Sequence, residues 1–383
     1  MTTPLPGGER FGAPQPDTHD AVVRLRQWGT DRFWFLPHAP LDGSGEWLIG
    51  TSGDCAFRVT DRLSARKHAR VAREGERWWV RDLGTPHGIR RDGMRCREFV
   101  ITPGVEIGIG ATVLVAETAH SVALRGFVQR ILGWGGDRMG VVDHALRAVR
   151  QLVAQRSPLI LHGEGDLISI AAALHRLALG EAAPFVVCDP RRGNTPASVR
   201  SAASFAHGIE AFVAAIGGSV CIRRKCVPPD LGELMQRLLA PESEVRLFVC
   251  ASPSRTPAIT FTSSMTVELP PLPLRENEIP RIIEDYAADA IRTLGAPQSC
   301  FTDDDRRWVM RHSARTLPEI AKGTLRVVAL NTSPSFTDAA KCLGMAQVSL
   351  VRWVGRRAPL PHAPASLPRS FVPAAPRSSA GAA

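Results

Sequence analysis

An apolar run, a glycine-rich loop and a helical stretch follow one another between residues 158 and 179, and this order limits the fold more than any other feature of the chain. Residues 158–162 are mostly apolar and short enough for a buried strand, 163–166 are Gly-Glu-Gly-Asp, and 167–179 have the composition of a helix. Loops that wrap a phosphate group have this layout, but they end in a lysine and a hydroxyl residue. Neither this loop nor the helix contains a lysine. The pattern therefore predicts an α/β fold that lacks phosphate chemistry.

A second strand-like run, 217–222, departs from a nucleotide hydrolase in the same way. A hydrolase places an acidic pair after such a strand, to hold magnesium and to orient the attacking water. Arg223, Arg224 and Lys225 stand there instead. Three cations cannot bind magnesium, so we expect no hydrolysis.

These residues carry a resemblance. From 137 to 330 the chain resembles the AAA+ domain of sigma-54-dependent (NtrC-type) activators, in which the loop is similar to GESGTGK and the later strand to GGTLFLDE. Gly163-Glu164 and Gly217-Gly218-Ser219 match these frames, and 271–276 match the family's PPLRER turn. The resemblance implies an α/β P-loop fold at 137–270 and a helical lid at 271–330.

The chemical residues of that family are missing from this chain. No segment between 189 and 217 matches the GAFTGA loop that contacts the sigma factor, and only Arg255 is available where the family has its arginine finger. Pro318 occupies the sensor arginine position, and Ser252 ends the strand of the polar sensor. We therefore expect no enzyme activity, no cofactor and no metal site. The remnant is a vestigial nucleotide site made of Gly163, Glu164 and Gly165.

Residues 21–115 have the pattern of short strands separated by turns, which favours an antiparallel β-sandwich. Four blocks in this region, 48–50, 64–69, 81–88 and 103–110, are similar to the frame GR…SRxHA…DLGSxNG…GDxIxIG of forkhead-associated (FHA) domains. The resemblance implies a sandwich that binds phosphothreonine peptides through loops at one end.

The binding residues of that family are kept only in part. Arg66 fills the arginine position, Ala65 stands in the phosphate-binding serine position with Ser64 one place early, and Thr51 replaces the arginine of the first block. Thr85 stands for the serine of DLGS, and His87 replaces the asparagine that holds the peptide backbone. The resemblance thus implies a phosphopeptide site made of Ser64, Arg66, Thr85 and His87. The alternative is a sandwich that serves only as a docking module.

Residues 331–357 have the pattern of two helices around a glycine turn, with helices expected at 336–343 and 347–354 and the turn at Gly344. This block resembles the Fis-type helix-turn-helix (AARxLGIxxxTLYRKL). The resemblance implies that Gln347 and Ser349 contact base edges while Arg352, Arg356 and Arg357 contact DNA phosphates. A helical hairpin without a role at DNA is the alternative.

Composition sets only wide limits on function. The net charge of +10 favours an acidic partner, although the high arginine content of proteins encoded by a GC-rich genome would produce the same value. The eight cysteines form no CxxC pair, which favours buried reduced thiols. No apolar run is long enough for a membrane span, and the N-terminus lacks the order of a signal peptide, so a cytoplasmic location without membrane contact is the default expectation.

The resulting hypothesis is a multidomain transcriptional regulator that binds a phosphorylated protein and DNA and has lost its ATPase. RNA polymerase, an active paralogue and a second copy of the chain are further partners that it leaves open. The alternative is a non-catalytic scaffold in Ser/Thr-kinase signalling. The expected domains are a disordered N-terminus (1–18), an FHA-like sandwich (19–118), a linker helix (119–136), a degenerate AAA+ domain (137–270), a helical lid (271–330), a helix-turn-helix (331–357) and a disordered tail (358–383).

Overall fold

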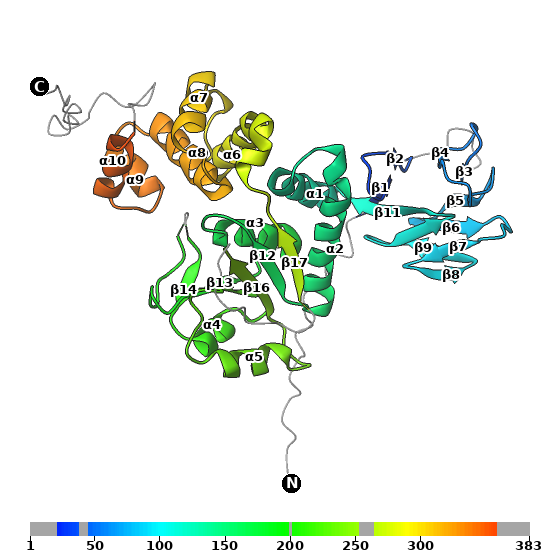
Figure 1. Ribbon diagram of the computed structural model, residues 1–383, viewed down its shortest axis with the longest axis horizontal. Helices are drawn as coiled ribbons and strands as arrows, with labels where there is room; N and C mark the ends of the chain where they lie inside the picture. Colours follow the sequence, from blue (N-terminus) through cyan, green and yellow to red (C-terminus); the bar gives the residue numbers. More distant parts are fainter. Residues whose placement is uncertain (1–20, 38–44, 199–200, 253–263, 358–383) are drawn as a thin grey trace, which may run out of the picture.

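The computed structural model describes residues 21–37, 45–198, 201–252 and 264–357. A β-sandwich and a pair of small helices lie at opposite ends of an elongated molecule, and a parallel sheet lies between them (Figure 1). The predicted disordered ends, 1–18 and 358–383, and Arg255 lie outside the described residues. No helix in the described ranges is long and apolar enough to cross a bilayer.

Two sheets form the N-terminal sandwich, as the alternating pattern predicted. Apolar side chains from both sheets, including Leu25, Ile49, Val80 and Ile107, are fully buried between them. All strand pairs are antiparallel except β3 with β4. In spatial order the first sheet is β2 (Phe33–Phe35), β1 (Val22–Gln27), β11 (Thr112–Thr118), β10 (Glu106–Ile109), β7 (Ile89–Arg91) and β8 (Met94–Cys96). The second is β4 (Phe57–Arg58), β3 (Glu46–Gly50), β5 (Ala69–Glu74), β6 (Arg77–Asp82) and β9 (Glu98–Ile101).

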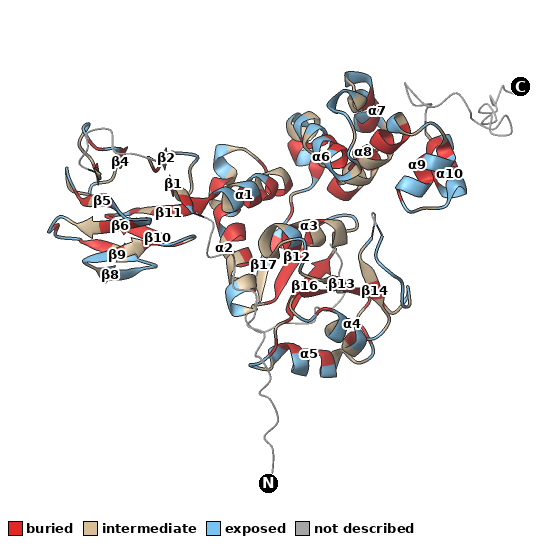
Figure 2. Ribbon diagram, turned by 180° about the vertical axis from the view of Figure 1, so that it is seen from behind, coloured by how far each residue is buried: buried red, intermediate tan, exposed pale blue. Residues whose placement is uncertain are grey.

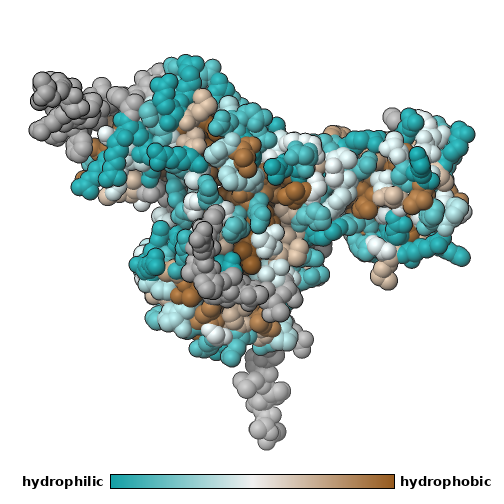
Figure 3. Space-filling view, viewed as in Figure 1, coloured by the Kyte–Doolittle hydropathy of each residue, from teal (hydrophilic) through white to brown (hydrophobic). Residues whose placement is uncertain are grey.

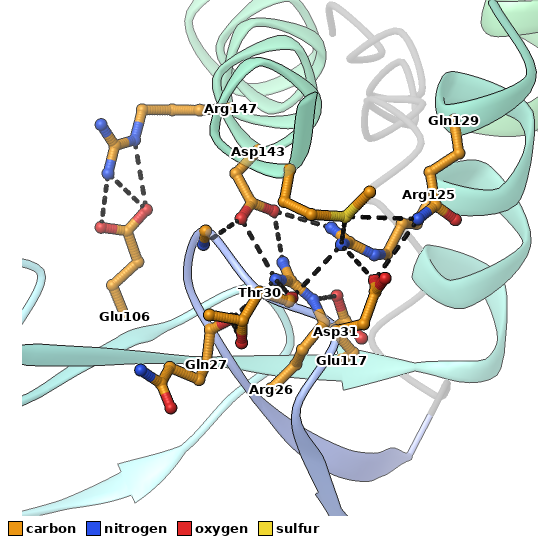
Figure 4. Close-up of polar contacts among 12 residues, drawn as sticks. Arg26, Gln27, Thr30, Asp31, Glu106, Glu117, Arg125, Gln129, Asp143 and Arg147 are labelled. Carbon is orange, nitrogen blue, oxygen red and sulfur yellow. Dashed lines mark hydrogen bonds and ion pairs between the residues drawn. The ribbon is translucent and has the colours of Figure 1, made fainter. Parts of the chain in front are cut away.

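The segment predicted as a linker helix is α1 (Ala119–Leu132), which begins directly after β11 with Thr118 as its N-cap. It packs against α2 (Met139–Gln155), and a buried ion cluster joins both helices to the sandwich (Figure 4). Asp143 of α2 accepts hydrogen bonds from Arg26 of β1 and, at 2.8 Å, from Arg125 of α1, and Glu117 of β11 accepts one from Arg26 at 2.6 Å. The sandwich is therefore held in a fixed orientation by groups buried at its base.

Six parallel strands form the central sheet, and helices cover both of its faces. Leu159 and Leu161 of β12 share a core with α2 and α3, whereas Ile160 between them shares a core with α4 and α5. Figure 2 shows these inner strands as buried. In spatial order the strands are β14 (Ala203–Phe205), β13 (Phe185–Cys188), β15 (Ser219–Arg223), β16 (Arg246–Ala251), β12 (Leu159–His162) and β17 (Met265–Glu268). The helices are α3 (Ile168–Leu179), α4 (Gly208–Ala214) and α5 (Leu231–Leu239).

The remaining helices form one packed unit rather than a lid and a separate block. Phe336 and Trp353 belong to the same core as Trp308 and Ile320, and the rings of Trp308 and Trp353 lie 5.4 Å apart. The boundary predicted at residue 331 falls inside α8, and the apolar side chains before and after this boundary belong to one core. This unit contains α6 (Ile279–Leu294), α7 (Asp303–His312), α8 (Leu317–Thr332), α9 (Phe336–Cys342) and α10 (Gln347–Gly355).

Candidate functional site

Three loops at one end of the sandwich are tied to one another by backbone hydrogen bonds. The N–H groups of Thr51 and Ser52, after β3, donate to the carbonyls of Ala65 and Arg66 in the β4–β5 loop, each at 3.0 Å. A Cβ on Gly50 would lie 2.2 Å from the Arg66 carbonyl oxygen, so only glycine allows this approach. The β4–β5 loop is therefore held rigidly against the end of β3.

His68 connects the β4–β5 loop to the β6–β7 loop from inside the fold. Its ring is fully buried, and Nδ1 accepts the N–H of Ala65 at 3.0 Å. The ring proton therefore lies on Nε2, which donates to the carbonyl of Gly88 at 2.9 Å. His68 therefore supports both loops from within the fold.

Thr85, predicted to contact the peptide, is buried and uses its hydroxyl within the β6–β7 loop. The hydroxyl donates to Asp82 Oδ1 at 2.7 Å and accepts the N–H of Gly88 at 3.2 Å. Nε2 of His68 lies 3.1 Å from the same oxygen. The structure therefore assigns Thr85 to loop support rather than to the surface that a ligand would meet.

Ser64, also predicted to contact the peptide, is likewise directed into the fold, by Asp61. Its hydroxyl donates to Asp61 Oδ2 at 2.7 Å and lies 3.1 Å from the Ile109 carbonyl. Burial raises the pKa of Asp61, but hydrogen bonds from Ser64, Thr112 and two backbone amides outweigh it and lower the pKa to about 2. The Asp-x-x-Ser spacing was the signal that could have identified this pair.

Two of the predicted site residues, Arg66 and His87, are exposed on these loops, and so is Lys67 next to Arg66. Within the described ranges, the Arg66 guanidinium has no hydrogen bond or ion pair. Lys67 lies 3.3 Å from Asp54, and both side chains are more than half exposed. Hydrogen bonding from Ser52 is the main cause of a lowered pKa at Asp54. The loops thus present an exposed guanidinium, an ammonium and an imidazole on a rigid base, which suits an anionic ligand.

The glycine loop at 163–166 has a different electrostatic arrangement. Asp166 lies 3.0 Å from Arg223 at the end of β15 and 3.2 Å from Lys322 of α8, and Arg223 also pairs with Asp189. Burial raises the pKa of Asp166, but Lys322 and Arg223 outweigh this effect and lower it. Lys322, a residue 156 positions away, therefore brings a lysine to the loop, but Asp166 neutralises it.

The loop is also in contact with the N-terminus of α8. A Cβ on Gly165 would lie 2.9 Å from the hydroxyl of Thr316, the N-cap of that helix. The hollow between the loop and the helices is lined by two carboxylates, Asp166 and Glu319, and by three cations, Lys322, Arg326 and Arg357. Gly163, Glu164 and Gly165, predicted to form a vestigial nucleotide site, lie in this loop directly after β12.

Of the five residues predicted to contact DNA, Gln347, Ser349 and Arg352 are exposed on α10, and Arg356 is exposed at its C-cap. Leu350, Val351 and Trp353 form the buried face of the same helix. Arg357 is not part of the exposed set. It donates to the carbonyls of His312 and Trp353 and lies 3.5 Å from Glu319, and so fastens the helix pair to the lid.

Cysteine and metal chemistry have little support in the described structure. Five of the eight cysteines are buried and all are free thiols. The Cys221 and Cys250 sulfurs lie 3.6 Å apart on neighbouring strands, and this contact, together with burial, raises the pKa of Cys221. No cluster of three His, Cys, Asp or Glu side chains able to hold a metal occurs in the ranges described.

Comparison with known proteins supports an FHA domain at the sandwich. The FHA domain model matches residues 47–110, so an FHA domain is present in this part of the chain. The FHA domain-containing protein FhaB of Mycolicibacterium smegmatis is 33% identical over 76 residues, which are 20% of this chain and 46% of FhaB. FhaB of Mycobacterium tuberculosis H37Rv is 33% identical over 72 residues, 19% of this chain and 43% of the relative. The chain thus matches less than half the length of these relatives.

Among solved structures, the FHA domain of FhaA in complex with the intracellular domain of Rv3910 is similar to this sandwich. It is 22% identical, covers 24% of this chain and 96% of its own, and gives a TM-score of 0.22.

Proposed function

We propose that this chain is an FHA-containing regulator related to sigma-54 enhancer-binding proteins. In this proposal the sandwich binds a phosphothreonine-bearing protein, the α9–α10 pair binds DNA, and the central domain hydrolyses no ATP. The exposed Arg66, on loops fixed by Gly50 and His68, is the observation that carries it.

The chemistry of phosphate recognition supports the first part. A phosphothreonine carries close to two negative charges and three acceptor oxygens, and a guanidinium can donate two parallel hydrogen bonds to it. Arg66 has no competing partner in the described part of the chain, and Lys67 on the same loop is a second cation that pairs with the exposed Asp54. The hydroxyls of Ser64 and Thr85 donate to Asp61 and Asp82, respectively. The proposed site therefore consists of Arg66, Lys67 and His87.

The central domain supports a relation in fold but not in chemistry. The glycine loop follows β12 at the carboxyl ends of parallel strands, which is where α/β sheets of this kind bind their ligands. The cations there are paired with Asp166 and Asp189, so little net positive charge is left for a triphosphate. We infer that this domain orients the two binding ends and needs no cofactor.

The exposed face of α10 supports DNA binding. The two predicted base readers, Gln347 and Ser349, lie in its first turn, and two arginines follow on exposed positions. A non-catalytic scaffold that does not bind DNA is the second candidate, and it is favoured by the packing of α9 and α10 into the lid core. RNA polymerase, an active paralogue and self-association belong to the first candidate as proposed partners.

A phosphopeptide titration tests the proposal. A phosphothreonine peptide library and its unphosphorylated counterpart would be screened against the full chain, and the best peptide titrated against Arg66→Ala. Losing hydrogen bonds to a charged group costs about 1.5–3 kcal/mol, so the variant should bind at least about tenfold more weakly. Arg77→Ala, an exposed arginine at the opposite end of β6, is the matched control. Equal affinities for wild type and Arg66→Ala would overturn the assigned site.

A further inference from the structure

A groove between α8 and α10 collects positive charge from two helices. Among the described residues, its walls contain Arg326 of α8 together with Arg352, Arg356 and Arg357, and no acidic side chain. Ser349, one of the proposed base readers, lines the same groove. The face of the molecule drawn in Figure 3 shows the helical end as mainly hydrophilic.

Trp353 fixes the position of two of these arginines. The guanidinium carbons of Arg326 and Arg357 each lie 4.8 Å from the centre of its ring. Such cation–π contacts hold a guanidinium in place without neutralising its charge. Glu319, next to the groove, pairs with Arg357 at 3.5 Å, whereas the exposed Arg352 and Arg356 have no ion pair among the described residues.

The arrangement suits a backbone with repeated phosphates. Arg352 of α10 and Arg356 at its C-cap are exposed and lie one turn apart, while Arg326 is contributed by α8, so the groove draws its cations from two helices. We infer that the α8–α10 groove holds the phosphodiester backbone of double-stranded DNA, so that the lid helix α8 takes part in DNA binding. This inference rests on the DNA binding proposed for α10.

The buried state of Trp353 favours a duplex over a single strand. Proteins that bind single strands without sequence preference stack the bases on exposed aromatic rings. Trp353 is only 9% exposed, with Arg326, Arg357 and Trp308 around its ring, and so provides no stacking surface. Phosphate contacts from the groove would instead set the position of Gln347 and Ser349 on the duplex.

The test measures binding of the full chain to a fluorescent 30-base-pair duplex across a series of salt concentrations. Each lost phosphate contact lowers the slope of log affinity against log salt by about 0.9. Arg326→Ala and Arg352→Ala should each show this loss and bind about fivefold more weakly near physiological salt. Arg292→Ala, which removes an exposed lid arginine outside the groove, should match wild type. Arg326→Lys keeps the charge and should retain the slope even if the packing on Trp353 weakens.

The outcomes separate this inference from the function on which it rests. Duplex binding with an unchanged slope in Arg326→Ala, while Arg352→Ala loses one contact, would overturn the role of α8 and leave α10 as the DNA-binding element. Equal affinity for a single strand of the same length would overturn the duplex assignment. No binding by wild type at low salt would overturn DNA binding and the groove together.

Discussion

The β4–β5 loop of the sandwich and the glycine loop of the central sheet both resemble phosphate-binding loops, yet they treat their cations in opposite ways. Arg66 is exposed and has no ion pair within the described residues, whereas Arg223 and Lys322 are both paired with Asp166 beside the glycine loop. A phosphate can displace water from a free guanidinium, but it must break an existing ion pair to reach a neutralised one. We therefore expect the availability of the cation, rather than loop shape alone, to decide phosphate binding.

The largest effect is expected at a third cluster, in which pairing is complete and buried. Asp143→Asn removes the carboxylate shared by Arg26 and Arg125, and all three side chains are at most 3% exposed. Leaving buried guanidiniums poorly paired should lower the free energy of unfolding of the sandwich by about 3 kcal/mol. Urea denaturation followed by tryptophan fluorescence measures the change. Asp137→Asn, whose side chain is 77% exposed, should be neutral, and equal effects for both variants would contradict the account.

A smaller effect is expected at the glycine loop. Arg223→Met leaves Asp189, which is 6% exposed, without its main partner and removes one of the two cations on Asp166. Because Arg223 is about a quarter exposed, solvent reduces the cost to about 2 kcal/mol. Thermal denaturation of the full chain would detect it, with the exposed Lys225→Met as control. An unchanged melting temperature would show that the ion pairs of Arg223 do not stabilise the fold.

The smallest effect is confined to acid. The pKa of Asp61 is about 2 in the folded protein against 3.8 for an ordinary aspartate. A lowered folded pKa means that the carboxylate contributes stability above pH 3.8, and that this contribution is lost as the pH falls toward about 2. Asp61→Asn should therefore flatten the fall in melting temperature between these values. An identical acid limb in wild type and variant would contradict the role assigned to this aspartate.

The sequence predicted those features that depend on local pattern. The apolar run before Gly163 became β12, the helical stretch after it became α3, and the turn-separated strands became the sandwich, because hydrophobic periodicity and turn residues act over a few positions. The FHA frame likewise located the exposed Arg66 and His87.

What the sequence did not reveal depends on contacts between distant segments. Ser64 and Thr85 stand near binding positions in the motif, but Asp61 and Asp82 determine where their hydroxyls point. Lys322 of α8 contacts Asp166 in the glycine loop, and the sequence of the loop itself does not predict this contact. The sequence also did not predict that α9 and α10 pack into the lid core. Each has the pattern of an ordinary amphipathic helix, which does not tell which element covers its apolar face.

Hydrogen–deuterium exchange on the full chain tests the contrast between the two loops most directly. The chain would be compared alone, with a phosphothreonine peptide selected from the library, and with Mg-ATP. The account predicts that the peptide slows exchange at 51–56, 62–68 and 84–88, and that Mg-ATP leaves 163–169 unchanged. Protection of 163–169 by Mg-ATP, or peptide protection that avoids the loop of Arg66, would contradict it.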